Sequence, residues 1–442
     1  MLSFLFTHTP LAFLVQSFWR DEAFSYILAK RNIFDIIILT AKDFNPPLYY
    51  LLLHFWMKLF GWSEISLRSF SLIFFWATVY VCMHFIEDIL KIKGKKSWIY
   101  LILIILNPLL NYYAFEARMY TLFTFFATLS FYSFFRKKNH LYLLSTILGL
   151  YTHYFMIFVL ASQAVYIWYI SKKYNIPHKS LKKMILTPLY VFAPWLLFVL
   201  IQKHFFSSSF WLAKSNIKTL IDLPALLYTG YEPGGVSKIA AGIITLISLF
   251  FWGILFAGIK LMKKHKKMHE EAHLLFKFLF IWSIIIPTAI VFISFIKPIF
   301  FPRYIIFATP GLLLLLFFVL EFFRRRTQKI LILIMFLITI GYGINQVKYR
   351  KKDNFRKTMH EIKALAKKDD VVYVESTLDY FTASYYFDEN RIYISNTSYD
   401  SIPDYVGKVL IPKEKIAASL PFYPKKAYIL KSNGSYLIQA LY

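Results

Sequence analysis

The stretch that decides the fold class is IIFATPGLLLLLFFVLEFFRRRTQKILILIMFLITIGYGINQV, residues 305–347. Two apolar runs, 305–323 and 330–347, are separated by the basic segment 324–329. A helix that crosses the hydrocarbon core of a membrane needs roughly 20 mainly apolar residues. The pattern therefore predicts two membrane-spanning helices that are joined by a short, positively charged turn.

Apolar runs of this kind recur along most of the chain. Of the 442 residues, 58% are hydrophobic and 17% are charged, whereas a soluble domain has about 45–50% apolar and about 25% charged residues. This composition excludes an ordinary soluble enzyme and a disordered chain, and predicts an all-α polytopic membrane protein with about eleven spanning helices. The other nine runs are 2–18, 65–90, 98–115, 119–135, 141–153, 155–170, 184–202, 239–259 and 274–296.

The net charge of +27 is concentrated in a few short loops. With eleven spans, 21 of the 51 Lys and Arg residues fall in five loops on one side, whereas the short loops opposite hold only Arg118, Lys297 and Arg303. Cytoplasmic loops carry an excess of Lys and Arg. We therefore expect a multi-pass protein of the cell membrane, with a cytoplasmic N-terminus, membrane lipid around it and no nucleic-acid partner. The five basic loops are 91–96, 136–140, 171–183, 260–273 and 324–329.

The last part of the chain, 348–442, has the composition of a globular domain. Residues 355–368 have helical periodicity, 370–375 and 391–395 have the pattern of strands, and Asn433-Gly434 predicts a hairpin turn. The hairpin strands would be 427–430 and 436–439. We expect a transmembrane domain over 1–347 and a small extracytoplasmic α/β domain over 348–442.

Two longer segments of the transmembrane part are predicted to form outer loops. In the first, 19–64, the apolar stretch after Asn45-Pro46-Pro47 is too short to cross a membrane comfortably, and it predicts a helix that lies in the interface. The second, 203–238, is long enough to be a lid or a binding element.

Polar residues at the predicted outward turns are the candidates for chemistry. A carboxylate there could act as a general base towards a hydroxyl group, and an arginine could hold a phosphate through charge-assisted hydrogen bonds. Each has a plainer interpretation: the acids could cap a helix, Glu116 and Arg118 could form a local pair, His153 could bond a neighbour, and Arg303 could extend to lipid headgroups. The candidates are Asp21, Glu22, Glu116, Arg118, His153, Arg303 and Tyr304.

Motifs of soluble enzymes are absent from the sequence. It contains no P-loop, no dinucleotide-binding fingerprint and no His-Glu-x-x-His zinc motif. No cluster of His, Cys, Asp or Glu has convincing metal-ligand spacing either.

Several short strings resemble the GT-C glycosyltransferases, in particular the branch of protein O-mannosyltransferases and aminoarabinose-type lipid A transferases. The similarity is most specific over 19–120 and looser after 150. The strings are WRDEA at 19–23, NPPLYY at 45–50, GWSEISLR at 61–68, EARMY at 116–120, Arg303-Tyr304 with Pro310, and DNFR at 353–356.

The resemblance implies a GT-C fold and an enzyme that takes a monosaccharide from a polyprenyl-phosphate donor. Transfer would occur on the outer face, usually with inversion at the anomeric carbon, to a protein, lipid or glycan acceptor. The acid after the first span, the family's proposed base, corresponds to Asp21, with Glu22 beside it, and the second-loop acid corresponds to Glu116. A divalent metal is left open, because some related enzymes bind one.

On this hypothesis, Asp21 deprotonates the acceptor, Glu22 and Glu116 orient the acceptor or the base, and two arginines stabilise the departing phosphate. The arginines are Arg118 and Arg303. Tyr49 and Tyr50 would line the mouth of the groove, and Lys203 could contact phosphate. These are expectations from the resemblance and from residue type.

Two other classes of function are weighed against the enzyme. A transporter or flippase of lipid-linked sugars would also need polar groups within the membrane, but the sequence has no inverted repeat and no matching pair of broken helices. A non-catalytic scaffold would leave the position of Asp21 and Glu22 unexplained. Release of free polyprenyl phosphate would distinguish an enzyme from both.

Overall fold

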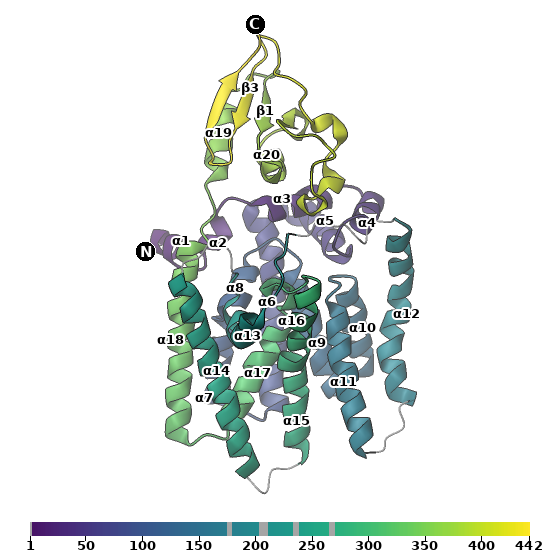
Figure 1. Cartoon of the computed structure of the whole chain (residues 1–442), viewed down its shortest axis with the longest axis vertical. Helices are drawn as coiled ribbons and strands as arrows, with labels where there is room; N and C mark the ends of the chain where they lie inside the picture. Colours follow the sequence, from purple (N-terminus) through teal and green to yellow (C-terminus); the bar gives the residue numbers. More distant parts are fainter. Residues whose placement is uncertain (1, 175–178, 203–210, 233–237, 265–269) are drawn as a thin grey trace.

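The computed structural model describes residues 2–174, 179–202, 211–232, 238–264 and 270–442. Long helices run side by side in one bundle, and a small domain with a β-sheet lies beyond one end of it (Figure 1). Shorter helices lie between the bundle and this domain. The fold therefore has a helical part, a layer of short helices and a C-terminal α/β part.

The bundle is built from helices that mostly coincide with the apolar runs. Their bounds are α6 (Glu64–His84) with η1 (Phe85–Ile89), α7 (Lys95–Ile105), α8 (Pro108–Ala114), α9 (Tyr120–Phe135), α10 (Asn139–Leu150), α11 (Met156–Tyr174), α12 (Lys179–Ile201), α14 (Lys238–Lys264), α15 (Glu270–Phe280) with η2 (Ile281–Ile285) and α16 (Ile286–Ile296), α17 (Ala308–Leu320) and α18 (Arg325–Tyr349). The predicted separation of 141–153 from 155–170 is confirmed, since α10 and α11 are distinct helices.

Five helical segments of the described chain are long and apolar enough to cross a membrane alone, and a bent pair would make six. The bent pair is α7 and α8, which meet at an angle of 61°. Pro108, at the first position of α8, has no N–H to continue α7, and the Asn107 side chain instead accepts a hydrogen bond from Leu110 N–H. The predicted run 98–115 is therefore broken, and the count of eleven spans is not confirmed.

The N-terminal run 2–18 does not span, and this prediction is wrong. It forms α1 (Leu2–His8) and α2 (Ala12–Val15), two helices of 7 and 4 residues with Pro10 between them. Phe13 and Phe18 are buried inside the protein, so some of the apolar side chains of this run pack against other parts of the chain.

The position of this run also bears on the predicted topology. In Figure 1, α1 lies at the end of the bundle that carries the C-terminal domain. The number of crossings depends on whether α7 and α8 together form one span, so the predicted cytoplasmic N-terminus and extracytoplasmic C-terminal domain stay predictions.

The helix α17 carries the apolar run that opened the sequence argument, and it lies at the centre of the bundle. All 13 of its residues are buried, as is expected for a helix that is hydrophobic on every side. Gly311 allows the buried Trp282 ring to pack directly on the helix, because a Cβ there would come 2.6 Å from a ring carbon.

Three short helices, α3 (Arg20–Ala29), α4 (Ile33–Ala41) and α5 (Leu48–Phe60), lie between the bundle and the C-terminal domain (Figure 1). The Asn32 side chain caps α4 by accepting a hydrogen bond from Asp35 N–H at 2.9 Å. Large apolar side chains of α4 and α5, among them Phe34, Phe55 and Leu59, are exposed. Such exposure at this level of the molecule is typical of helices that lie on a membrane surface.

The C-terminal domain contains a four-stranded sheet in the order β2-β1-β3-β4. Its strands β1 (Val371–Val374), β2 (Ile392–Ile394), β3 (Ala427–Leu430) and β4 (Tyr436–Gln439) confirm the four predicted strands, and α19 (Phe355–Leu365) confirms the predicted helix. β1 is parallel to β2 and β3, and β3 pairs antiparallel with β4 across the predicted hairpin. All four residues of β1 are buried, as is usual for a strand inside a parallel sheet.

The described part of the predicted outer loop 203–238 contains a helix, α13 (Ile217–Thr229). A reciprocal capping box of Asn216 and Thr219 begins it, and Gly230 ends it in the left-handed conformation. Leu223, Leu227 and other side chains of α13 are buried. This stretch is therefore an integral part of the packed bundle.

Candidate functional site

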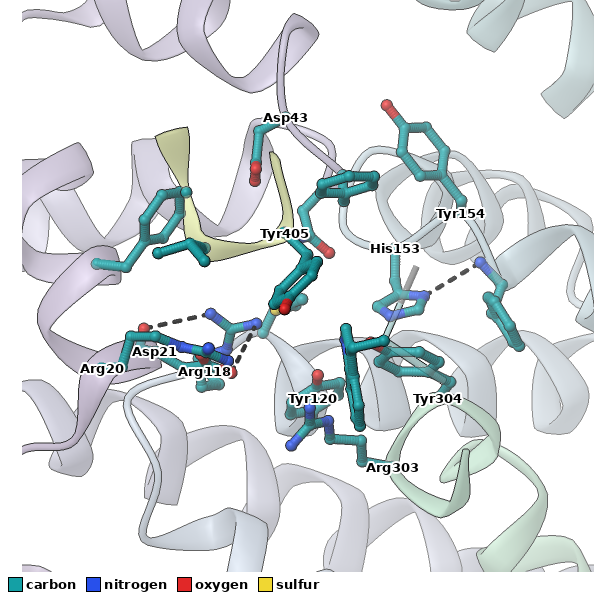
Figure 2. Close-up of a pocket in the computed structure, with 18 residues that line it drawn as sticks. Arg20, Asp21, Asp43, Arg118, Tyr120, His153, Tyr154, Arg303, Tyr304 and Tyr405 are labelled. Carbon is teal, nitrogen blue, oxygen red and sulfur yellow. Dashed lines mark hydrogen bonds and ion pairs between the residues drawn. The ribbon is translucent and has the colours of Figure 1, made fainter. Parts of the chain in front are cut away.

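Two neighbouring cavities lie where the bundle, the short helices and the C-terminal domain meet. The first has a volume of about 180 Å³ and contains Asp21, Arg118, His153 and Arg303 in its wall (Figure 2). The second has a volume of about 360 Å³. The residues common to both walls are Arg20, Trp211, Arg303 and Tyr405.

Asp21 is a carboxylate held between two arginines. It lies in the first turn of α3, its Oδ1 accepts a hydrogen bond from Arg20 Nε at 2.9 Å, and its Oδ2 is 3.6 Å from Arg118 Nη2. Burial acts to raise the pKa of Asp21, but the charges of Arg118, Arg20 and Arg303 outweigh it and hold the pKa below its ordinary value. Asp21 is therefore ionised at neutral pH and faces the first cavity.

Glu22 points away from both cavities and forms a fully buried ion pair. Its two carboxylate oxygens each accept a hydrogen bond from Arg68 at 2.8 Å, and both side chains are 0% exposed. Lys352 Nζ donates to Oε2 at 2.8 Å, and Ala117 N–H donates to Oε1 at 3.1 Å. These contacts make Glu22 a residue that joins α3, α6, the turn before α9 and the start of the C-terminal domain.

Glu116 lies in the wall of the second cavity and is only 1% exposed. No hydrogen bond reaches either of its carboxylate oxygens from the described part of the chain, and Lys352 Nζ lies 3.6 Å from Oε1. Burial raises the pKa of Glu116, which the positive charge of Lys352 only partly offsets. A carboxyl group in this state is available to bond a hydroxyl group in the cavity.

Arg303 sits between the two cavities and is surrounded by aromatic rings. Its guanidinium carbon lies 4.8 Å from the ring centre of Phe301, 5.4 Å from that of Trp211 and 5.7 Å from that of Tyr304. It forms no ion pair with a described residue, and its buried Nε has no hydrogen-bond partner there. Arg303 therefore keeps its charge and at least one hydrogen-bond donor, Nε, for an anion.

His153 and Tyr304 complete the floor of the first cavity. His153 Nδ1 accepts a hydrogen bond from Phe155 N–H at 3.1 Å, so Nε2 is the nitrogen that carries the proton in the neutral ring. Burial and the charge of Arg118 lower the pKa of His153 to about 3, which keeps the ring neutral. The rings of His153 and Tyr304 lie 6.0 Å apart.

Besides Glu22, two predicted residues lie outside the walls of both cavities, and one is not described. Tyr49 and Tyr50 are fully buried in α5 and do not line either cavity, so their predicted place at the mouth of a groove is wrong. The α5 helix turns them towards the protein, where Tyr49 packs on Phe70. Lys203 lies outside the described residues.

Several cavity residues were missed by the sequence argument, among them Asp43 and Tyr405. Asp43 ends the connection from α4, two residues before the Asn45-Pro46-Pro47 string, and burial raises its pKa to about 6. Its proximity to that string was the only available signal. Tyr405 belongs to the C-terminal domain, and nothing local in the sequence indicates that it reaches the membrane-side cavities.

Among the described residues there is no group of three or more His, Cys, Asp or Glu side chains that could hold a metal ion. The polar side chains in the walls of the two cavities are mainly carboxylates, arginines and tyrosines, with His153 and Asn45.

Comparison with known proteins identifies the fold. No family model matches the chain, and no curated protein matches it in sequence. The crystal structure of apo ArnT from Cupriavidus metallidurans is similar with a TM-score of 0.63 at 11% identity, covering 94% of this chain and 89% of ArnT. ArnT bound to undecaprenyl phosphate is similar with a TM-score of 0.62 at 12% identity, covering 98% and 93%. The predicted GT-C fold, a polytopic helical protein with a small C-terminal sheet, is confirmed.

Proposed function

We propose, from the GT-C fold that this chain shares with ArnT, that it is a membrane glycosyltransferase. It moves a monosaccharide from a polyprenyl-phosphate donor to an acceptor hydroxyl group, with inversion at the anomeric carbon. The binding of undecaprenyl phosphate by ArnT supports a donor of this class. The observation that carries the proposal is one cavity in which an ionised carboxylate, Asp21, lies beside Arg118 and Arg303.

The two arginines are suited to the donor phosphate. Each has a buried Nε that lacks a hydrogen-bond partner among the described residues, and both line the first cavity. Arginine binds phosphate oxygens through paired, charge-assisted hydrogen bonds. When the bond from the sugar to the phosphate breaks, the departing polyprenyl phosphate gains charge, which Arg118 and Arg303 would stabilise.

Asp21 is the proposed base. It removes the proton from the acceptor hydroxyl group, the oxygen forms a bond to the anomeric carbon, and the bond from that carbon to the phosphate oxygen breaks. A single displacement of this kind inverts the anomeric centre. The low pKa of Asp21 keeps the group ionised, so an acceptor site for the proton is present, although the group is a weaker base than an ordinary carboxylate.

The other carboxylates have different proposed tasks. Glu116, whose oxygens lack hydrogen bonds in the described structure, would orient the acceptor hydroxyl group from the second cavity. Glu22 would position α3, and with it Asp21, through Arg68 and Lys352. Tyr304 and the neutral His153 would contact the sugar at the floor of the first cavity.

The reaction is proposed to take place on the extracytoplasmic face. The connections between α6 and α7, and between α17 and α18, lie at the end of the bundle away from the C-terminal domain, where Lys96 pairs with Glu321 at 2.8 Å. Because these connections are rich in Lys and Arg, the positive-inside rule assigns that end to the cytoplasm. The cavities and the C-terminal domain are then outside.

The test is Asp21→Asn in the full-length protein, assayed in membranes with polyprenyl-phosphate sugars for release of polyprenyl phosphate. General-base catalysis contributes typically 10²–10⁴-fold, so a loss of about this size is expected. Asp35→Asn is the matched control, because Asp35 is exposed on the neighbouring helix α4. A wild-type rate in well-expressed Asp21→Asn protein would refute the base. A flippase would move the donor across the membrane without releasing polyprenyl phosphate.

A further inference from the structure

Among the described residues, the C-terminal domain reaches the first cavity through one short segment, and its Arg350 and Leu378 line the second cavity. This segment is η6 (Asp404–Val406) followed by Gly407, and Tyr405, Val406 and Gly407 all line the first cavity. Figure 2 shows the Tyr405 side chain pointing into the pocket above Arg118 and Tyr120. The domain is therefore part of the cavity wall.

The segment is held in place by close packing on α3, the helix that carries Asp21. Gly407 has a φ of +92°, and a Cβ on it would come 2.7 Å from the ring of Phe24 and 2.9 Å from that of Phe381. Phe24 and Phe381 themselves pack edge to face, with ring centres 5.4 Å apart. Both the backbone conformation and the space around it thus require glycine at this position.

Ion pairs and hydrogen bonds further attach the domain to the short helices. Arg31 Nη2 lies 2.7 Å from Glu389 Oε1, and Phe18 N–H donates to the Tyr386 hydroxyl oxygen at 2.8 Å. Tyr386 in turn donates to Glu64 at 2.8 Å. The place of Tyr405 relative to Asp21 is therefore set by several independent contacts between the two parts.

Tyr405 belongs to the wall of both cavities, together with Arg20, Trp211 and Arg303. Its hydroxyl group forms no hydrogen bond with any described residue, although the group is next to two polar cavities. An aromatic ring with an uncommitted hydroxyl group provides an apolar face and a polar handle at once. A sugar ring has matching features: its C–H face can pack on the aromatic ring, and its hydroxyl groups can bond the phenol hydroxyl group.

We propose that Tyr405 is a positioning residue for the donor monosaccharide and determines which sugar is accepted. The ring packs on the sugar while the hydroxyl group bonds one of its neutral hydroxyl groups, and the phosphate is left to Arg118 and Arg303. The C-terminal domain thereby supplies sugar selectivity, while the membrane part supplies the chemistry. This inference rests on the proposed function.

The experiment compares full-length wild-type protein with Tyr405→Phe, Tyr405→Ala and Gly407→Ala. The donors are undecaprenyl phosphate carrying glucose, mannose, galactose or arabinose, and the readouts are donor KM, relative rates and binding of undecaprenyl phosphate alone. Tyr442→Ala is the control, because Tyr442 is a fully exposed tyrosine of the same domain.

For the preferred donor we expect a rise in KM of roughly 3- to 10-fold in Tyr405→Phe, which loses one hydrogen bond. In Tyr405→Ala the rise should be at least about 10-fold, with a weaker preference among the sugars. Gly407→Ala should act in the same direction by displacing the segment. Binding of undecaprenyl phosphate alone should stay within about twofold of wild type, because its phosphate is held elsewhere.

Unchanged KM and unchanged sugar preference in Tyr405→Ala would overturn the inference, as would a parallel loss of undecaprenyl phosphate binding. If the wild-type protein released no polyprenyl phosphate from any donor, the proposed function would fail. The inference would then be decided by binding alone. The wild type should bind the sugar-linked lipid more tightly than undecaprenyl phosphate, and Tyr405→Phe should reduce that difference.

Discussion

Replacing Arg68 by methionine tests whether the buried charge network holds the site together. The Arg68 guanidinium makes two hydrogen bonds of 2.8 Å to Glu22 and three more to the carbonyl oxygens of Leu14, Gln16 and Ser17, at 3.0, 2.6 and 3.1 Å. It thereby ties α6 both to α3 and to the N-terminal segment. Methionine has a similar length but can provide none of these hydrogen bonds.

The magnitude follows from the burial of both partners. Arg68 and Glu22 are 0% exposed, and removing one partner of a buried ion pair costs about 3–5 kcal/mol because the other charge is left uncompensated. Lys352 still contacts Glu22 at 2.8 Å, which limits the loss, whereas the three orphaned carbonyl groups increase it. We expect the free energy of unfolding to fall by about 3 kcal/mol or more.

The assay is thermal unfolding in detergent, together with Glu22→Gln and the double variant Arg68→Met/Glu22→Gln. The double variant should lose less stability than the sum of the two single variants, because neither of the paired charges remains to be buried alone. Lys357→Met is the control, since Lys357 and Glu361 form an exposed pair at 3.9 Å. The reasoning would be refuted if Arg68→Met were as stable as this control, or if the two single effects added.

Three further predictions concern other parts of the molecule. Burial raises the pKa of Asp43 from 3.8 to about 6, so its contribution to stability is present below pH 3.8 and lost as the pH rises through 6. The free energy of unfolding of Asp43→Asn should therefore exceed that of wild type by up to about 3 kcal/mol at pH 7.5 and by less at pH 5, measured as a higher Tm. A difference in Tm that is independent of pH would contradict this. Gly311→Ala should destabilise by about 1–3 kcal/mol, because its Cβ would meet the Trp282 ring at 2.6 Å, whereas Gly341→Ala, with open space around it, should be neutral or slightly stabilising in the same Tm measurement. Arg303→Ala should raise donor KM by roughly 10- to 100-fold through loss of charged hydrogen bonds, and an unchanged response to donor concentration would remove Arg303 from the site.

The N-terminal run illustrates where a prediction from hydropathy reaches its limit. Its 17 residues, 2–18, are apolar enough for a span, yet Pro10 separates two short helices and part of the run packs on protein. Hydropathy reflects only how favourable it is to transfer a side chain out of water. Burial in lipid and burial inside the protein both satisfy this preference. The same ambiguity explains α17, whose apolar residues are buried at the centre of the bundle.

The candidate carboxylates also show a difference between what residue type indicates and what the fold decides. Asp21 and Glu22 are adjacent in sequence and both carry a carboxyl group, so residue type alone does not distinguish their roles. In the fold they face different ways: Asp21 lines a cavity, and Glu22 pairs with Arg68 and Lys352. The two Glu22 partners Arg68 and Lys352 lie 46 and 330 residues away along the chain, a separation that no local pattern encodes.

The sequence by itself determined that this is a helical membrane protein with a small C-terminal α/β domain. The reason is that run length, apolar composition and strand periodicity are local properties, and each one decides how a short segment interacts with water or lipid. Only the tertiary structure decided which polar residues share a cavity, that Tyr49 and Tyr50 do not, and that Tyr405 of the C-terminal domain does. A site is a set of distances between residues that are far apart in the chain. Such distances follow from how helices and domains pack, and packing is a property of the whole molecule.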